Sequence, residues 1–297
     1  MVTKVRGSAA NHYPSYADLI AKYTQAPASF KAGDVVTLTD EGIAGDGVIV
    51  VDPAHGLTST RGVIVVLYIN TYWRRAYSDS VDPRWWEAVG GTGQSTPTRE
   101  ANLTSLQEMI DFLGTESTYV GDRTWYEIDG LSALKINSAM TIESLWVWGY
   151  QASHNTIETY SLDLPPGESN YSSNIVMTDC FIWSEQNSAV KGRFWQCKFY
   201  RNIFRSHLGY CLWFEAEALS TGNYVVDNYF TGYVRGIYGQ AGLRKPTDMH
   251  IRDNRFWKGD GAYEGNVEAS IYLEGISGSR LTGNHYFGGA SLAYLYV

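Results

Sequence analysis

The sequence predicts a mainly β protein: a right-handed parallel β-helix with an N-terminal capping helix, preceded by a small α+β connector domain. Three observations lead to this fold class. One short pattern returns five times in the last third of the chain, glycine (30) greatly outnumbers proline (8), and one amphipathic segment stands before the repeats. Many glycines and few prolines favour short strands joined by tight turns. We expect residues 1–90 to form the connector and residues 91–297 the capping helix and the solenoid.

The repeated pattern is an apolar residue, then Asn or Cys three positions later, then a large apolar residue two positions further on. It reads Met177-Cys180-Ile182, Phe194-Cys197-Phe199, Val225-Asn228-Phe230, Ile251-Asn254-Phe256 and Leu281-Asn284-Tyr286. A repeat whose spacing varies indicates a solenoid with constant rungs and variable loops. We expect the Asn and Cys side chains, Cys180 and Cys197 included, to form one stacked column at a turn that needs a left-handed residue. The alternative is a sandwich of unrelated strands with similar turns.

Composition limits the possible partners. The net charge of −8 argues against nucleic acid or an anionic membrane surface, and it would repel an acidic polysaccharide unless local basic residues compensate. Tyrosine (22) and tryptophan (10) are abundant, which indicates a surface that contacts a ligand or another chain. The three cysteines have neither metal-site nor disulfide-framework spacing, so no metal and no cofactor are expected. No apolar run approaches the length of a membrane span, and residues 1–10 lack the apolar core of a signal peptide.

The first ninety residues read as a small α+β module. Residues 11–26 predict a helix that Ser15 caps, with Leu19, Ile20 and Tyr23 on one face. Four strands are expected after it, at residues 34–38, 47–51, 62–69 and 72–75. No catalytic constellation is visible in this module.

A second helix is expected directly before the solenoid. A polar stretch covers residues 94–102, and Thr104 and Gln107 then have the spacing of a capping box. An apolar stripe follows, and Gly114 ends the helix. Such a helix can cover the open end of a solenoid, whose first rung would otherwise expose its core and strand edges.

Four segments resemble the tailspike and tail-fibre proteins of bacteriophages. GDVVTL at residues 33–38 and WRR at residues 73–75 match strands of the connector in that family. VDPRWWEAVGGTG at residues 81–93 matches the segment that opens the β-helix, and TSLQEMI at residues 104–110 matches the capping helix. The Asp-Asp pair that precedes this helix in the family is absent, and residues 94–98 stand in its place.

The resemblance implies a pectate-lyase-like β-helix in a virion protein of the phage tail, acting at the host cell surface. It implies a homotrimer, attachment to phage tail or baseplate proteins, and recognition of a bacterial surface polysaccharide, either O-antigen or capsule. It leaves open whether the chain cleaves that polysaccharide as an endoglycosidase, and whether the β-helix is truncated soon after Asn284. The alternative function is a non-catalytic adapter or spacer that positions other fibres of the tail.

Cleavage of a glycosidic bond by hydrolysis needs two carboxylates. Glu215 and Glu217 are the candidate catalytic residues, because their i, i+2 spacing places both on one side of a strand. Trp213 shares that side and is expected to stack on a sugar ring. Tyr229 and Tyr233 fall outside the apolar columns and are further candidates for substrate binding. The alternative is a strand face whose carboxylates are only solvated.

Other polar residues are interpreted as structural. Asp179, Asp227 and Asp253 each precede a ladder position, as turn-forming residues do, and His207 and His250 lack partners at ligand spacing. Basic residues are scattered and no Asp cluster has the spacing of a calcium loop. Hydrolase chemistry is therefore favoured over lyase chemistry.

Overall fold

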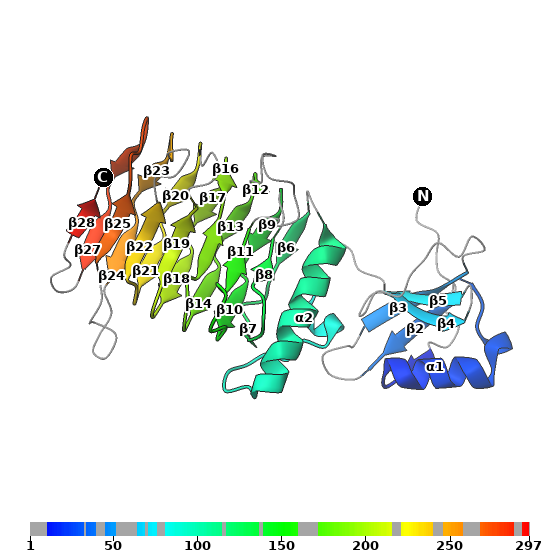
Figure 1. Cartoon of the computed structure of the whole chain (residues 1–297). Helices are drawn as coiled ribbons and strands as arrows, with labels where there is room; N and C mark the ends of the chain where they lie inside the picture. The colour runs from blue at the N-terminus through cyan, green and yellow to red at the C-terminus, as the bar shows by residue number, and fades with distance from the viewer. Residues whose placement is uncertain are drawn as a thin grey trace. The chain divides into compact units, whose positions relative to one another are not determined.

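The structure is a computed structural model (Figure 1). It describes residues 11–32, 34–39, 45–51, 64–68, 71–75, 81–114, 117–136, 139–159, 172–215, 221–239, 246–257, 268–287 and 293–296. The chain divides into two compact units, Met1–Ala88 and Val89–Val297. Among the described residues, no helix is both long enough and apolar enough to cross a membrane.

The first unit is a five-stranded sheet with one α-helix. The strands are β1 (Asn11–Tyr13), β2 (Val35–Leu38), β3 (Gly45–Val51), β4 (Ile64–Tyr68) and β5 (Thr71–Arg75), in the order β1-β2-β3-β5-β4. Strands β1 and β2 are parallel, and the other pairs are antiparallel. The helices are α1 (Tyr16–Gln25), η1 (Pro27–Ser29) and η2 (Pro83–Trp86).

Helix α1 begins as the sequence predicts. Ser15 caps it in a capping box with Asp18, and Leu19 and Tyr23 are buried in the core of this unit. Ile20, expected on the same face, is exposed. The helix is shorter than predicted, because residues Asn11–Tyr13 pair with β2 as a strand.

The second unit is built from three parallel sheets of seven strands each. Sheet I contains β6 (Thr118–Val120), β9 (Thr141–Glu143), β13 (Val176–Thr178), β17 (Lys198–Tyr200), β20 (Tyr224–Val226), β23 (His250–Arg252) and β26 (Arg280–Thr282). Sheet II contains β7 (Trp125–Ile128), β10 (Trp146–Gly149), β14 (Phe181–Ser184), β18 (Ile203–Ser206), β21 (Tyr229–Thr231), β24 (Arg255–Trp257) and β27 (His285–Phe287). Sheet III contains β8 (Leu134–Lys135), β11 (Ile157–Glu158), β15 (Val190–Gly192), β19 (Tyr210–Phe214), β22 (Arg235–Gly239), β25 (Ala269–Leu273) and β28 (Ala293–Tyr296). A short pair, β12 (Ser172–Ser173) and β16 (Phe194–Trp195), lies between sheets III and I.

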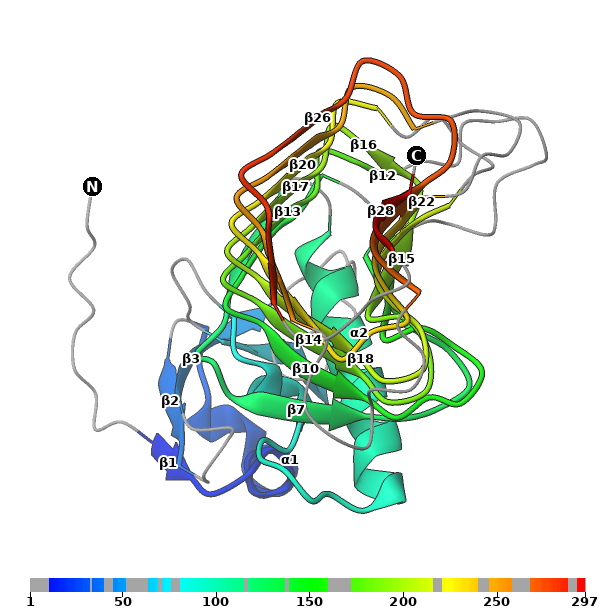
Figure 2. The ribbon, with the colours of Figure 1, turned by 90° about the vertical axis from the view of Figure 1, so that its left-hand side faces the viewer.

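The solenoid is right-handed. Each rung passes through sheet I, sheet II and sheet III in that order. Figure 2 views the unit from its C-terminal end, where the path runs from sheet I on the left through sheet II below to sheet III on the right. The chain advances toward the viewer along this anticlockwise path, and such a path is a right-handed helix. The predicted right-handed parallel β-helix is confirmed.

Aromatic rings are stacked along the interior of the solenoid. Phe204, Phe230, Phe256 and Tyr286 follow one another on successive strands of sheet II, with ring centroids 5.4, 4.8 and 5.4 Å apart. The three phenylalanines are fully buried. Such columns form in a solenoid because each rung places its residue directly above the equivalent residue of the neighbouring rung.

The turn between sheets I and II carries a continuous ladder of side chains. Cys180, Asn202, Asn228, Asn254 and Asn284 occupy it, and the Oδ1 atom of each Asn accepts a hydrogen bond from the backbone N–H of the preceding ladder residue at 2.9 to 3.1 Å. The Nδ2 atom of each Asn donates to a backbone carbonyl of the preceding rung. The predicted column is thus correct at four of its positions.

Cys197 is the exception, and its placement in that column is wrong. Its backbone N–H donates to Asn223 Oδ1 at 3.0 Å. Cys197 and Asn223 belong to a second column, at the turn that precedes sheet I. The ladder residue of this rung is Asn202, which the repeat pattern missed. In this rung the turns on either side of β17 both place an apolar residue three positions before Cys or Asn, Phe194 before Cys197 and Phe199 before Asn202, so sequence alone does not separate them.

The left-handed residue of each turn lies one position before the ladder. Asp179, Arg201, Asp227, Asp253 and Gly283 have φ angles of 55, 53, 57, 59 and 65°. The interpretation of the aspartates as turn-forming residues is confirmed. The expectation that the ladder Asn itself adopts the left-handed conformation is wrong: the residue before it does so, while the Asn side chain bonds the preceding rung.

Helix α2 (Thr96–Leu113) packs on β7 and β8 of the first rung and buries Leu106 and Met109 (Figure 1). It ends at Gly114, as predicted, but it begins eight residues before Thr104, with Ser95 as its N-cap. The predicted start is wrong because the Thr104 hydroxyl donates to the Glu100 carbonyl inside the helix, so Thr104 does not act as a cap.

Candidate functional site

The outer face of sheet III carries a group of aromatic side chains from three successive strands, which we call the aromatic strip. Trp213, Tyr238 and Tyr272 are paired in register on β19, β22 and β25, and the ring of Tyr210 lies beside them. Neighbouring ring centroids are 5.7 Å (Trp213 to Tyr238), 5.6 Å (Tyr238 to Tyr272) and 4.3 Å (Tyr210 to Tyr238). These rings are tilted rather than stacked. Tyr238 in the middle is only 7% exposed, whereas Trp213, Tyr210 and Tyr272 are half-buried and contribute part of their rings to the surface.

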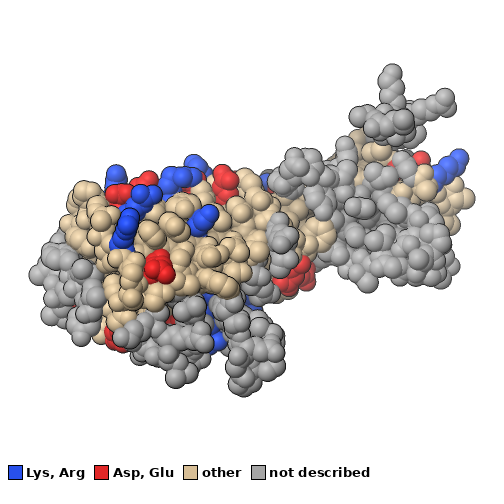
Figure 3. All heavy atoms as spheres, turned by 90° about the horizontal axis from the view of Figure 1, so that it is seen from above, with Lys and Arg blue, Asp and Glu red and all other residues tan. Residues whose placement is uncertain are grey.

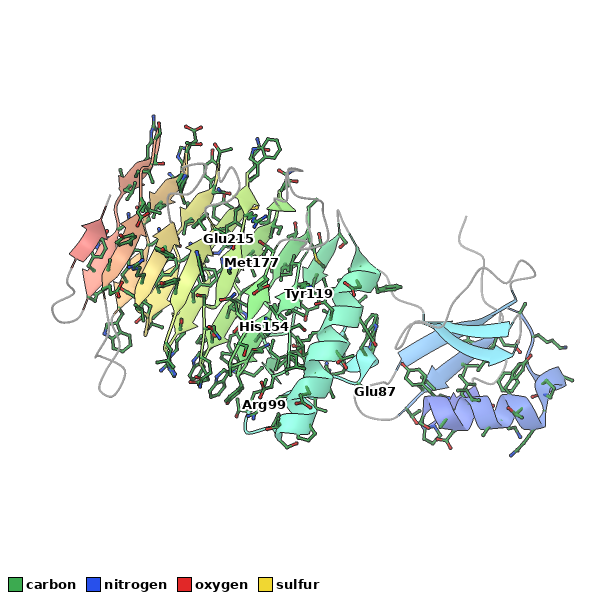
Figure 4. The ribbon with its side chains drawn as sticks, viewed as in Figure 1. Glu87, Arg99, Tyr119, His154, Met177 and Glu215 are labelled. Atoms are coloured by element: carbon green, nitrogen blue, oxygen red, sulfur yellow. The ribbon has the colours of Figure 1, made fainter. Side chains whose placement is uncertain are left out.

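One end of the aromatic strip is bordered by a carboxylate between two cations. Glu215, labelled in Figure 4, directly follows β19 and is half-buried. Its Oε1 atom lies 2.9 Å from Lys191 Nζ, and its Oε2 atom accepts a hydrogen bond from Arg193 Nε at 2.9 Å. Lys191 Nζ also lies 4.3 Å from the centroid of the Trp213 ring. The side chain of Glu215 is therefore fixed beside the strip.

An arginine lies within the strip itself. The guanidinium carbon of Arg235 is 3.9 Å from the ring centroid of Tyr272, 4.5 Å from that of Tyr238 and 5.5 Å from that of Tyr210. Its Nη2 and Nε atoms lie 2.6 and 2.7 Å from Glu268 Oε2. Cation–π contacts and an ion pair together hold this arginine in one position.

A second carboxylate follows β25 as Glu215 follows β19. Glu274 is hydrogen-bonded at 2.8 Å by the Tyr272 hydroxyl, and its backbone N–H donates to the Gly239 carbonyl at 2.8 Å. The preceding residues, Phe214 and Leu273, each pair in register with Gly239. The backbones of Glu215 and Glu274 are thus two strand spacings apart, or about 10 Å.

The structure brings together two of the five sequence candidates and separates two others. Trp213 and Glu215 lie side by side on the outer face of sheet III, whereas Glu217 lies outside the described residues. Tyr229 lies on β21, on the outer face of sheet II, where its ring is 6.3 Å from Trp257. It does not belong to the aromatic strip.

The prediction for Tyr233 has to be corrected. Its side chain was expected to bind substrate, but the residue is only 3% exposed and its hydroxyl lies 2.9 Å from Ser270 Oγ. Burial raises the pKa of this phenol. Tyr233 is part of the packed interior because the turn from sheet II to sheet III directs it inward, and it cannot touch a ligand.

The outer face of sheet II holds an aromatic group that sequence reasoning missed. Trp148 and Trp183 stack with centroids 3.8 Å apart and an interplanar angle of 6°. Tyr150 stacks on Trp148, and the Arg205 guanidinium lies 4.2 Å from the Trp183 ring. The faces of both indoles are therefore covered by other side chains, which is why we do not regard this group as a stacking surface for sugars.

The same face pairs a histidine with a glutamate. Glu185 Oε1 accepts a hydrogen bond from Trp148 Nε1 at 2.8 Å, and its Oε2 atom lies 2.5 Å from His207 Nδ1. Sequence reasoning found no partner for His207 at ligand spacing, and the structure pairs it with Glu185. The pair is separated by 22 residues, the distance of one rung, so the ladder step from Cys180 to Asn202 was the signal that could have found it.

No cluster of three or more potential metal ligands occurs among the residues that the structure describes. The arrangement on sheet III supplies aromatic rings, cations and three carboxylates, those of Glu215, Glu268 and Glu274, within a few rungs. Aromatic rings can in general stack on the apolar faces of sugars, and polar groups can hydrogen-bond sugar hydroxyls.

Comparison with known proteins gives matches among solved structures. No protein-family model matches the chain, and no curated protein matches its sequence. The chain is similar to the enzymatically active domain of tailspike protein 2 of bacteriophage CBA120, with 12% identity, a TM-score of 0.46, and coverage of 94% of this chain and 53% of that one. It is similar to ORF18 of Geobacillus virus E2, with 10% identity, a TM-score of 0.45, and coverage of 92% and 62%. It is also similar to the tailspike protein of Acinetobacter baumannii phage AM24, with 12% identity, a TM-score of 0.40, and coverage of 86% and 53%. The chain thus spans between about half and three fifths of the length of these structures.

Proposed function

We propose that this chain is a tailspike or tail-fibre component of a bacteriophage virion that binds a bacterial surface polysaccharide along the outer face of sheet III. The O-antigen and the capsule are the two polysaccharide classes at a bacterial surface that a tail protein meets first. The observation that carries the proposal is the aromatic strip with its bordering charges, in register over three strands. A regular solenoid face suits a regular polymer, because successive rungs present the same kind of side chain to successive sugars.

The proposal includes hydrolysis by a carboxylate pair. The backbones of Glu215 and Glu274 lie about two strand spacings apart along the aromatic strip, and from such positions two carboxyl groups can reach the separation of about 6.5 to 9.5 Å that leaves room for an attacking water. Hydrolysis through this pair would invert the anomeric centre. Glu217 remains a third candidate for this chemistry. Assembly as a homotrimer and attachment to tail or baseplate proteins belong to the same proposal.

The test is incubation of the protein with purified lipopolysaccharides and capsules from a panel of bacteria, with binding followed by biolayer interferometry and chain length by gel electrophoresis. One polymer is expected to bind and to shorten. Trp213→Ala is expected to weaken binding, whereas Glu215→Gln and Glu274→Gln are expected to stop shortening and to retain binding.

The matched controls are Tyr224→Ala and Glu143→Gln, both on the outer face of sheet I. Binding without shortening would leave a recognition protein and reject the hydrolase part of the proposal. No binding to any polymer would reject the proposal and favour the non-catalytic adapter.

A further inference from the structure

The setting of Arg235 indicates which class of polysaccharide the sheet III face accepts, and this inference rests on the function proposed above. We propose that the ligand carries a carboxylate, as in a uronic or nonulosonic acid, and that Arg235 binds this group in the position that Glu268 now occupies.

The position of Arg235 supports this inference. Arg235 pairs in register with Tyr210 on one side and Ala269 on the other. The guanidinium lies among the rings of the aromatic strip, within 5.5 Å of three ring centroids. Arg235 is 17% exposed, so it is desolvated enough to interact strongly and still reachable from outside.

The exposure and the bonding of Glu268, the partner of Arg235, also support it. Glu268 is 49% exposed and precedes β25, so it approaches Arg235 from the edge of the sheet rather than from the core. A single oxygen of Glu268, Oε2, accepts both hydrogen bonds from the guanidinium, from Nη2 at 2.6 Å and from Nε at 2.7 Å. An exposed carboxylate can swing into water at small cost. The carboxylate of a sugar can then take the fork with both oxygens, which is the stronger arrangement.

The distribution of charge also favours cations at the site of an acidic polymer. A chain with a net charge of −8 repels an acidic polymer unless cations lie where the polymer binds. Lys191 and Arg193 border the same strip on the other side, where the two cations share the single carboxylate of Glu215. Elsewhere on the solenoid, Figure 3 shows Lys and Arg interspersed with Asp and Glu on the face seen from above, so the negative charge is not a uniform field. Screening at physiological salt further confines the repulsion to about 8 Å.

Arg235 and Glu268 therefore have opposite roles in binding. Arg235 attracts the ligand carboxylate, and Glu268 competes with it for the same guanidinium. Removal of Glu268 should therefore tighten binding, an outcome that a purely structural ion pair would not produce.

The test uses the polymers of the panel, half with neutral and half with acidic repeat units, and measures binding to the whole chain. Any acidic polymer that binds is also prepared in a carboxyl-reduced form by carbodiimide activation and borohydride reduction. We expect the bound polymers to be acidic and the reduced form to bind at least about tenfold more weakly. We expect Glu268→Gln to bind the native polymer up to about tenfold more tightly, and Arg235→Gln to bind it about 10- to 100-fold more weakly.

Three controls keep the test specific. Lys198→Gln removes one positive charge from β17 on sheet I and should leave affinity unchanged. Arg235→Lys keeps the charge but not the fork, and should give an intermediate loss. The carboxyl-reduced polymer needs no variant, so the result does not depend on whether Arg235→Gln folds.

The outcomes separate this inference from the proposed function. The role of Arg235 would be overturned by a neutral ligand, by equal binding of the native and the carboxyl-reduced polymer, or by weaker binding of Glu268→Gln. In each of these cases Trp213→Ala still tests whether the polymer binds on sheet III. No binding to any polymer would overturn the proposed function and this inference with it.

Discussion

The turn between sheets I and II and the outer face of sheet III are built from the same rungs but follow different rules. At the turn, one residue type repeats, and the amides of Asn202, Asn228 and Asn254 are buried and bonded to the rungs on both sides. On the face, neighbouring rungs place Trp213, Tyr238 and Tyr272 at one position and surround them with charges that differ from rung to rung.

The difference shows how a solenoid separates stability from recognition. A buried amide without a partner costs free energy, so each turn position tolerates few residues. An outward position has water as an alternative partner, so its residues can vary. The comparison predicts that changes in the interior and the turn reduce stability, whereas changes on the face of sheet III alter binding.

The largest loss of stability is expected in the interior stack. Phe230→Ala removes a buried ring between Phe204 and Phe256 and should lower the free energy of unfolding by about 3 to 5 kcal/mol. Urea unfolding followed by circular dichroism measures this. The matched control is Trp213→Ala on the outer face, for which a loss as large as that of Phe230→Ala would contradict the distinction between the two regions.

The next largest effect is expected in the ladder. Asn228→Ala leaves the Asn202 backbone N–H and the Phe199 carbonyl without their buried partners, and should cost about 2 to 4 kcal/mol. Asn284 lies at the end of the ladder and is half-buried, so water can replace part of its bonds. Asn284→Ala should therefore cost clearly less in the same unfolding experiment, and equal losses would contradict burial as the reason why the ladder bonds stabilise the fold.

A smaller effect is expected at the left-handed turn position. Asp227→Val forces a β-branched residue to φ 57° and should cost about 1 to 2 kcal/mol. Asp227→Gly should be nearly neutral, since Gly283 occupies the equivalent position in a later rung. Thermal unfolding of the two variants checks this. If valine were tolerated as well as glycine, backbone conformation would not be what selects this residue.

The smallest effect is a pH dependence at sheet II. Burial lowers the pKa of His207, and the contact with Glu185 offsets only part of this. The unfolded chain therefore binds a proton first as the pH falls through the ordinary histidine pKa of about 6.5, and stability is lost in that direction. His207→Asn should show a smaller drop in Tm between about pH 7.5 and 5.5 than the unmodified chain. An identical drop in both would assign the pH dependence to other groups.

Sequence reasoning reached the fold because the interior is periodic. The apolar residue before Asn228, Asn254 and Asn284 marks a rung each time, and Gly114 marks the end of the capping helix. It misplaced Cys197 because two turns of one rung share a pattern, and only the backbone path separates them.

The site was less accessible to sequence reasoning. Glu215 and Trp213 stood out because they are close in the chain. Glu268 and Glu274, which flank one predicted strand, were only weaker candidates, because it is strand register that brings them and Arg235 to the same face. Register depends on loop lengths, which vary between rungs. Tyr233 was misjudged because a turn can direct inward a side chain that alternation alone would place outside.

The measurement that tests the central claim most directly is hydroxyl-radical footprinting of the chain with and without the polysaccharide that binds it. The claim predicts that oxidation of Trp213, Tyr210 and Tyr272 on sheet III falls when the polymer is present. It also predicts unchanged oxidation of Tyr224 on sheet I and Trp146 on sheet II, which serve as internal controls. Protection of either control residue without protection of Trp213 would contradict the assignment of the binding face to sheet III.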